Sequence, residues 1–144
     1  METDLIKQYI ANNHFGKTIG MNFEIIEPGL VHYFLTIKTE HLATPNAAHG
    51  GVISALMDSL LGVTGLSYVY KENNVVSTVE FKINFLSPAL LNDELFGVGK
   101  IEQKGNRLMI ISGDIICPKR NNVAIAKGIG TFNIYPAIKA GFLI

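Results

Sequence analysis

The feature that most constrains the fold of this chain is a long segment, residues 49–70, that is apolar nearly all the way round a helix. Its large apolar residues cover most of a helical circumference: Val52, Ile53, Leu56, Met57, Leu60, Leu61, Val63, Leu66 and Val69. A helix of this kind has no polar face to turn toward water, so we expect the rest of the chain to enclose it. Its single carboxylate, Asp58, then needs an explanation, because burying a charge without partners is costly.

The exception to this apolar surface is a narrow stripe of small and polar residues. Its members lie three or four positions apart and therefore share one helical face: Gly51, Ser54, Asp58, Gly62 and Gly65. Side chains this small allow another backbone to approach the helix closely. The stripe favours a functional role for Asp58 over that of an ordinary surface carboxylate.

Strand-like segments flank this helix in the sequence. A short amphipathic helix is expected at residues 4–14, and six strands are expected at residues 21–27, 30–39, 75–86, 94–103, 107–117 and 123–135. Turn residues between neighbouring strands indicate hairpins and therefore an antiparallel sheet. A sheet that curls around the apolar helix buries it best. We therefore predict an α+β hotdog fold, a long central helix wrapped by a curved antiparallel β-sheet, in a single domain spanning residues 1–144.

Two segments carry more detailed expectations. In residues 75–86, strict alternation places Val79 and Phe81 on one face of the strand and Thr78 and Glu80 on the other. The last nine residues, 136–144, are unusually apolar for a terminus, so we expect them to dock on this subunit or on a neighbour.

The charge and the chain start exclude several kinds of partner. Twelve Lys and Arg balance twelve Asp and Glu, and the longest basic run is the pair Lys119-Arg120, so neither nucleic acid nor a membrane surface is expected to bind. One cysteine, Cys117, permits no internal disulfide and fits a reducing compartment. The start of the chain is acidic and lacks the long apolar core of a secretory signal. We therefore expect a cytoplasmic protein.

The histidines outside the central helix give no sign of a metal site. His14, His32 and His41 show no ligand-like spacing with carboxylates or with the cysteine, and we expect them at the surface or at strand edges. No metal and no cofactor are implied.

The start of the central helix carries a motif that is more specific than its composition. His49-Gly50-Gly51 is followed, nine residues after the histidine, by Asp58, and the next strand runs from Thr78 to Ser87-Pro88-Ala89. This combination resembles the hotdog-fold acyl-CoA thioesterases of the phenylacetate-pathway and thioesterase-superfamily-member type. The residue-level resemblance covers about residues 41–89, and the order of elements matches over nearly the whole chain.

The resemblance implies a role for each matching residue. Asp58 acts as general base or nucleophile, and the Gly50 backbone N–H polarises the thioester carbonyl. His49 helps to shape that carbonyl site, while Thr78 holds Asp58 or the attacking water. Many relatives carry an Asn further ahead of the His-Gly-Gly, whereas the only candidate in this chain is Asn46, three residues before it.

The spacing of these groups predicts an oligomer. Eight residues of helix separate Gly50 from Asp58, which is about 12 Å of rise, yet both must reach one carbonyl group. A twofold dimer with antiparallel central helices sets Gly50 of one chain opposite Asp58 of the other and creates two composite sites. We therefore expect a homodimer as the catalytic unit, and the resemblance suggests a homotetramer built as a dimer of dimers.

The expected substrate is an acyl-CoA, whose phosphates need partners. Candidates for binding coenzyme A are the amide of Gly51 and four cations: Lys104, Arg107, Lys119 and Arg120. Two alternatives stay open on sequence grounds, an acyl-thioester dehydratase or hydratase of the same fold, and a hotdog protein that binds acyl-CoA without turning it over.

Overall fold

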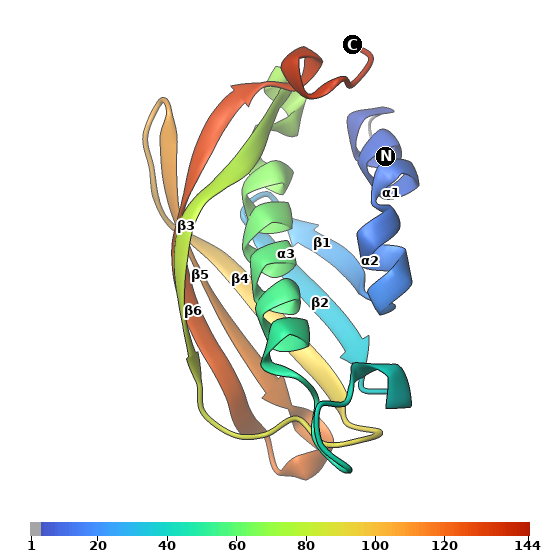
Figure 1. Cartoon of the computed structure of the whole chain (residues 1–144). Helices are drawn as coiled ribbons and strands as arrows, with labels where there is room; N and C mark the ends of the chain where they lie inside the picture. Colours follow the sequence, from blue (N-terminus) through green and yellow to red (C-terminus); the bar gives the residue numbers. More distant parts are fainter. Residues whose placement is uncertain (1–3) are drawn as a thin grey trace.

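The computed structural model describes residues 4–144. Over these residues one long helix, α3, lies against a curved six-stranded antiparallel sheet (Figure 1). The helices are α1 Asp4–Asn12, α2 His14–Ile19 and α3 Gly50–Val69. The strands are β1 Asn22–Glu27, β2 Leu30–Thr36, β3 Asn74–Phe85, β4 Glu94–Lys104, β5 Leu108–Cys117 and β6 Val123–Pro136. The predicted hotdog architecture is confirmed; residues 1–3, part of the acidic chain start, lie outside the described residues.

The amino-terminal segment forms two helices where the sequence predicted one. α1 ends just before Asn13, whose side-chain oxygen accepts a hydrogen bond of 3.1 Å from the Gly16 N–H and so begins α2. An asparagine that bonds its own backbone in this way interrupts one helix and caps the next. α2 then ends at Gly20, which takes the left-handed conformation that favours glycine. Both helices lie along the side of α3 that faces away from β3, β5 and β6 (Figure 1).

The strand order of the sheet is β1-β2-β4-β5-β6-β3. β3 follows α3 in the chain but pairs with β6, so it forms one edge of the sheet and β1 forms the other. The sequence patterns predicted the strands but not their order in the sheet. β3 is twelve residues long, and the backbone groups along its outer side have no strand partner within residues 4–144. Long edge strands of this kind are sites for pairing with another chain.

The core forms where α3 meets a depression in the sheet. Gly113 of β5 and Gly128 of β6 are register partners. A Cβ at these positions would lie only 3.0 and 2.8 Å from the sulfur of Met57, so glycine is required for the approach. Met57 is completely buried there. By length and composition α3 could cross a membrane, but most of it is buried in this fold, as expected of an enclosed core helix.

β3 departs from the predicted alternation at a β-bulge between Thr78 and Glu80. The extra residue, Val79, is 58% exposed while Phe81 packs on the core, so the prediction that the two share one face of the strand is wrong. The bulge re-phases the strand, so that Thr78 reaches toward α3 and Phe81 still packs on the core. The irregularity therefore turns a polar side chain toward the central helix without exposing the apolar residues that follow.

The carboxyl-terminal segment docks on α1. The Gln8 side chain donates a hydrogen bond of 2.8 Å to the Leu143 carbonyl and accepts one of 2.9 Å from the Leu143 N–H. Phe142 packs on the small cluster that includes Leu5 and Ile6. Of the two expected possibilities, docking on this subunit or on a neighbour, the structure shows the first for Phe142 and the Leu143 backbone, and this contact helps to hold α1 in place. The side chains of Ile138, Leu143 and Ile144 stay exposed.

Candidate active site

The start of α3 is an exposed turn capped by its own histidine. His49 is the N-cap residue in extended conformation, and its Nδ1 accepts a hydrogen bond of 2.7 Å from the Gly51 N–H. This bond uses the amide of Gly51, which the sequence suggested as a coenzyme A contact. The Gly50 N–H, by contrast, has no protein acceptor within residues 4–144. It lies at the positive end of the helix dipole, where a carbonyl oxygen that gains negative charge is stabilised.

A cavity of about 300 Å³ adjoins this turn. Its lining comes from α3, from β6, from the end of β3 and from the loop that follows it, with Gly50, Phe85 and Pro88 among its residues. A Cβ placed on Gly50 would lie 3.6 Å from the Phe85 ring, an ordinary contact. The space around the Gly50 amide is therefore apolar and open to an approaching group.

Asp58 lies two turns further along α3 and is half-buried. Thr78 Oγ1 donates a hydrogen bond of 2.6 Å to Asp58 Oδ1. The bulge in β3 makes this contact possible, because it turns Thr78 toward the helix. The bond fixes one carboxylate oxygen and leaves the other available to a substrate or a water molecule.

The small-residue stripe on α3 is only partly as predicted. Gly51 is exposed, and Ser54, Asp58 and Gly62 are half-buried, so they form an open face of an otherwise buried helix. Gly65 does not belong to this face. It is buried beneath β3 and β5, where an added Cβ would lie 2.9 Å from Ile111. Asp58 is thus half-exposed in a single chain, and an apposed surface would complete its enclosure.

A second cavity, of about 320 Å³, adjoins Asp58. Its walls come from the amino-terminal helices, α3, β3, β6 and the tail, and they combine aromatic residues with hydroxyl and amide groups. Its lining residues include Tyr9, Asn13, Asp58, Ser59 and Thr78. The sequence predicted a short amphipathic helix at residues 4–14 but did not single out Tyr9 or Asn13. Tyr9 lay on the apolar side of a predicted amphipathic helix, and that position gave no sign of a cavity.

One chain does not bring Gly50 and Asp58 together. They line two different cavities, and the helix between them rises about 12 Å. β3 borders both cavities, since Thr78 lines the one near Asp58 and Phe85 lines the one near Gly50. The two reactive ends therefore lie along the same exposed edge of the sheet.

Asn46 lies apart from both groups in the loop before α3. Its carbonyl accepts a hydrogen bond of 3.0 Å from the Leu91 N–H, and its side-chain oxygen accepts one of 3.4 Å from Thr44 Oγ1. The described residues show no hydrogen bond from Asn46 to His49, Gly50 or Asp58. The hydrogen bonds that Asn46 makes to Leu91 and Thr44 therefore stabilise the conformation of the loop.

The four candidate cations separate into two pairs. Lys119 and Arg120 follow β5 and lie at the end of the sheet where α3 begins, as the bond from Arg120 Nη2 to the Pro88 carbonyl shows. Lys104 lies over the ring of Tyr68, in the last turn of α3, with Nζ 5.8 Å from the ring centroid. Arg107 is exposed in the same β4–β5 turn as Lys104. The two pairs thus lie at opposite ends of the central helix.

Two of these cations already have acidic partners. Lys119 pairs with Glu94. Arg120 binds the nearly buried carboxylate of Asp93 through Nε and Nη2, at 2.7–3.0 Å. Burial raises the pKa of Asp93, but the bonds from Arg120 and the Leu90 N–H outweigh it and hold the pKa below its usual value. Arg120 thus anchors the loop beside Gly50, and this role competes with binding a phosphate.

The histidines outside the motif are not all peripheral. His14 is exposed and His32 is half-buried, but His41 is buried, contrary to expectation. Its Nδ1 accepts from the Lys38 N–H at 2.9 Å and its Nε2 lies 2.8 Å from the Ile19 carbonyl. The ring therefore ties α2 to the segment that leads into α3. Within residues 4–144, no group of three or more potential metal ligands occurs.

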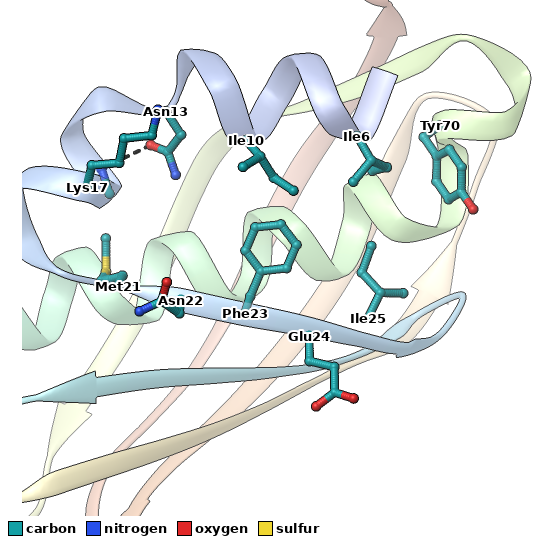
Figure 2. A pocket seen from close by; sticks show the side chains of 11 residues that line it. Ile6, Ile10, Asn13, Lys17, Met21, Asn22, Phe23, Glu24, Ile25 and Tyr70 are labelled. Atoms are coloured by element: carbon teal, nitrogen blue, oxygen red, sulfur yellow. Dashed lines mark hydrogen bonds between the residues drawn. The ribbon is translucent and has the colours of Figure 1, made fainter. Parts of the chain in front are cut away.

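A further hollow lies on the other side of α1 from Asp58. It measures about 500 Å³ and runs between the amino-terminal helices and β1. Figure 2 shows Ile6 and Ile10 of α1 directed toward Phe23 and Ile25 of β1. Among the described residues that line this hollow, no carboxylate accepts a hydrogen bond from a hydroxyl group as Asp58 does. The candidate catalytic groups therefore line the cavities beside Gly50 and Asp58.

Comparisons with known proteins show the family of the chain. Residues 46–124, more than half of the chain, match the thioesterase superfamily. The chain therefore belongs to the thioesterase superfamily. It is also 24% identical over 130 residues to a protein of Thermoplasma acidophilum named as a candidate esterase, a match that covers 90% of this chain and 95% of that protein.

Solved structures share the fold. The PaaI protein of E. coli, from the phenylacetic acid degradation operon, superposes with a TM-score of 0.82 at 17% identity, covering 90% of each chain. A hypothetical thioesterase of Streptococcus pneumoniae, solved with coenzyme A, gives a TM-score of 0.74 at 20% identity, covering 88% of this chain and 97% of that one. The predicted likeness to hotdog thioesterases is confirmed. Family membership supports a hydrolase of acyl thioesters in general.

Proposed function

We propose that this protein is an acyl-CoA thioesterase that releases a free acid and coenzyme A. The observation that carries the proposal is the pairing, on one helix, of an unused backbone N–H at Gly50 with a carboxylate at Asp58 that Thr78 holds. The first group suits an oxygen that gains negative charge, and the second suits a base or a nucleophile. Thioester hydrolysis needs both.

The proposed reaction begins when the thioester carbonyl accepts a hydrogen bond from Gly50. Asp58 either removes a proton from a water molecule that attacks the carbonyl carbon, or attacks that carbon itself and is then released by water. In both cases the C–S bond breaks and the thiolate of coenzyme A leaves with its electron pair and takes up a proton. His49 supports the helix start through its bond to Gly51. Thr78 orients Asp58, and Asn46 contributes through the loop ahead of His49.

The catalytic unit of this proposal is a homodimer. Pairing of the β3 edges about a twofold axis would align the open stripes of two α3 helices in opposite directions. Gly50 of each chain would then face Asp58 of the other, and the two separate cavities of one chain would become two halves of a continuous site. A homotetramer formed from two such dimers is the proposed assembly.

Coenzyme A is the proposed leaving group because a structural neighbour was solved with it. Of the candidate cations, Lys104 and Arg107 lie at the end of α3 away from Gly50 of their own chain, and in an antiparallel dimer they approach the Gly50 end of the partner. Lys119 and Arg120 lie beside the Gly50 of their own chain and serve mainly to hold the loop. We propose a cytoplasmic location, where coenzyme A thioesters are made and used.

Thiol release from a panel of short, medium and aromatic acyl-CoAs tests the proposal, with Asp58→Asn measured in parallel. We expect turnover of at least one member of the panel and its near-complete loss in the variant. Conversion of an enoyl-CoA, followed by its double-bond absorbance and without thiol release, would instead identify a dehydratase or hydratase. Tight acyl-CoA binding with no turnover would identify a binding protein.

A further inference from the structure

The cavity beside Asp58 has a polar region formed by the amino-terminal helices. Tyr9 of α1 and Asn13, between α1 and α2, line this cavity together with aromatic and aliphatic side chains of β3, β6 and the tail. A pocket for a plain hydrocarbon chain gains nothing from a phenol and an amide, because polar groups cost free energy when an apolar ligand covers them. The Asn13 amide already caps α2 and donates to Tyr9, so the Tyr9 hydroxyl is the group that points to a bound ligand atom.

The position of the Tyr9 ring is fixed by packing. Its centroid lies 6.1 Å from that of Phe23, and Phe23 lies 5.5 Å from the buried ring of Tyr33. The Gln8–Leu143 bonds and the burial of Ile6 hold α1 at the same place. The hydroxyl of Tyr9 is thus a preorganised group rather than a mobile surface phenol.

The hydrogen bonding of the Tyr9 hydroxyl is incomplete on its donor side. Its Oη accepts a long hydrogen bond of 3.4 Å from Asn13 Nδ2. This is its only hydrogen bond among residues 4–144, where the hydroxyl donates none. Buried tyrosine hydroxyls ordinarily find a partner, so an acceptor on a bound ligand is the missing one.

The charge state of Tyr9 suits a donor. Burial raises its pKa above the ordinary value, the neighbouring Tyr33 hydroxyl lowers it, and the nearby carboxylate of Asp58 raises it again, with a net increase. The phenol therefore keeps its proton throughout the neutral range. An acceptor oxygen on the ligand is also compatible with Asp58, whereas a second carboxylate would be repelled.

We propose that Tyr9 is a specificity-determining residue whose hydroxyl donates a hydrogen bond to an oxygen in the distal part of the acyl group, so that hydroxy- or keto-acyl thioesters are preferred over alkanoyl thioesters of equal size. This inference rests on the proposed thioesterase function and adds a substrate class to it. The cavity of about 320 Å³ is about twice the roughly 150 Å³ that encloses a benzene molecule. An acyl group of short to medium length therefore fits.

The test is a set of acyl-CoAs that carry a hydroxyl or keto oxygen at successive positions from C3 to C8. Each is paired with the alkanoyl-CoA of the same number of non-hydrogen atoms. The measured quantity is the ratio of kcat/KM within each pair, by thiol release, for the wild type, Tyr9→Phe and Tyr68→Phe. Tyr9→Phe removes one hydroxyl and keeps the ring, while Tyr68 lies outside the cavity and provides the matched control.

We expect the wild type to prefer the oxygenated member at one position or more. Tyr9→Phe should lower that ratio by about 3- to 10-fold, the usual range for one hydrogen bond, and should leave the alkanoyl-CoA rate unchanged. Tyr68→Phe should change neither. Thermal unfolding of the three proteins checks that the variants are folded.

Three results would overturn the inference. If the kcat/KM ratio in Tyr9→Phe were unchanged at every position, the Tyr9 hydroxyl would not bind an oxygen of the acyl group. The thioesterase function would be unaffected by that result. An equal loss for both members of a pair would place Tyr9 in the common chemical step instead. Absence of thiol release from the whole set by the wild type would remove the proposed function and this inference together.

Discussion

The first and third turns of α3 differ in nearly every respect that matters for chemistry. At the first turn the backbone is exposed, the Gly50 N–H has no partner among the described residues, and the adjoining cavity is largely apolar. At the third turn a side-chain carboxylate is half-buried, Thr78 holds it, and the adjoining cavity contains hydroxyl groups. One region supplies donors and the other supplies a base, about 12 Å apart. A single helix thus carries both halves of a reaction but cannot use them on one substrate.

Removing the carboxylate at the third turn should have the largest effect. Asp58→Asn keeps the size of the side chain and its contact with Thr78 but cannot accept a proton. We expect kcat for acyl-CoA hydrolysis to fall by about 10²- to 10⁴-fold, the usual contribution of a general base. Steady-state thiol release measures the loss, and thermal unfolding should stay near that of the wild type because the site is half-exposed. A rate within threefold of wild type would contradict the role of Asp58.

Removing the amide proton at the first turn should cost less but still be severe. Gly50→Pro deletes the N–H at the first helical position, where proline is tolerated, and His49 already has the extended conformation that precedes proline well. We expect kcat/KM to fall by about 10²- to 10³-fold, as for loss of an oxyanion donor.

Gly50→Ala is the matched control for that variant. It keeps the N–H, and its added Cβ meets the Phe85 ring at an ordinary contact distance. Activity within a few-fold of the wild type is expected. Equal losses in the alanine and proline variants would attribute the effect to bulk rather than to the hydrogen-bond donor.

The loop beside the first turn should depend on its ion pair, whereas the third turn should not. Arg120→Met leaves the nearly buried Asp93 without its cation, and we expect the free energy of unfolding to drop by about 2 to 3 kcal/mol at neutral pH. Because the folded-state pKa of Asp93 is lowered, this stabilisation is complete above the ordinary carboxyl pKa. It is lost as the pH falls through the folded-state value, so the wild type and the variant should converge in acid.

Chemical denaturation at a series of pH values measures that difference. Lys127→Met is the control, since it breaks an exposed pair with Asp114 and should change stability by no more than about 1 kcal/mol. A constant gap between Arg120→Met and the wild type down to strongly acidic pH would show that the ion pair is not its source.

The smallest expected effect concerns the orientation of Asp58. Thr78→Val removes the 2.6 Å hydrogen bond at nearly constant volume, and we expect kcat/KM to fall by about 3- to 10-fold. Thr78→Ser should restore most of the activity because it keeps the hydroxyl. Thr131→Val provides a second control, since it removes an exposed bond to Glu80 on the neighbouring strand. If the serine variant were as slow as the valine variant, packing rather than the hydroxyl would explain the loss.

Sequence patterns predicted the elements of this fold because each pattern has a local cause. The apolar circumference of residues 49–70 required enclosure, and alternation with turn residues marked the strands. The strand order could not be predicted, since β3 pairs with β6, a strand far from it in the sequence. The bulge at Val79 was also not predicted, because the alternation in the sequence continues through it without interruption. The bulge arises from the packing of the strand against α3, which is a tertiary contact.

The candidate site also has features with a local sequence cause and features that depend on long-range contacts. Asp58, Gly50 and Thr78 were found through a motif and its spacing, and the distance between the first two followed from helix geometry alone. The use of the His49 ring as a helix cap, the burial of Gly65 and of His41, and the place of Tyr9 in a cavity all depend on contacts between distant elements. No local pattern encodes such contacts.

The most direct test of the central claim, that the first turn of one chain works with the third turn of another, is subunit complementation. Asp58→Asn and Gly50→Pro proteins, each inactive alone, are unfolded together, refolded as an equal mixture and assayed for thiol release. Random pairing makes half of the dimers mixed, each with one intact site of two, so we predict about a quarter of the wild-type activity. A mixture no more active than its two components would contradict a site shared between chains.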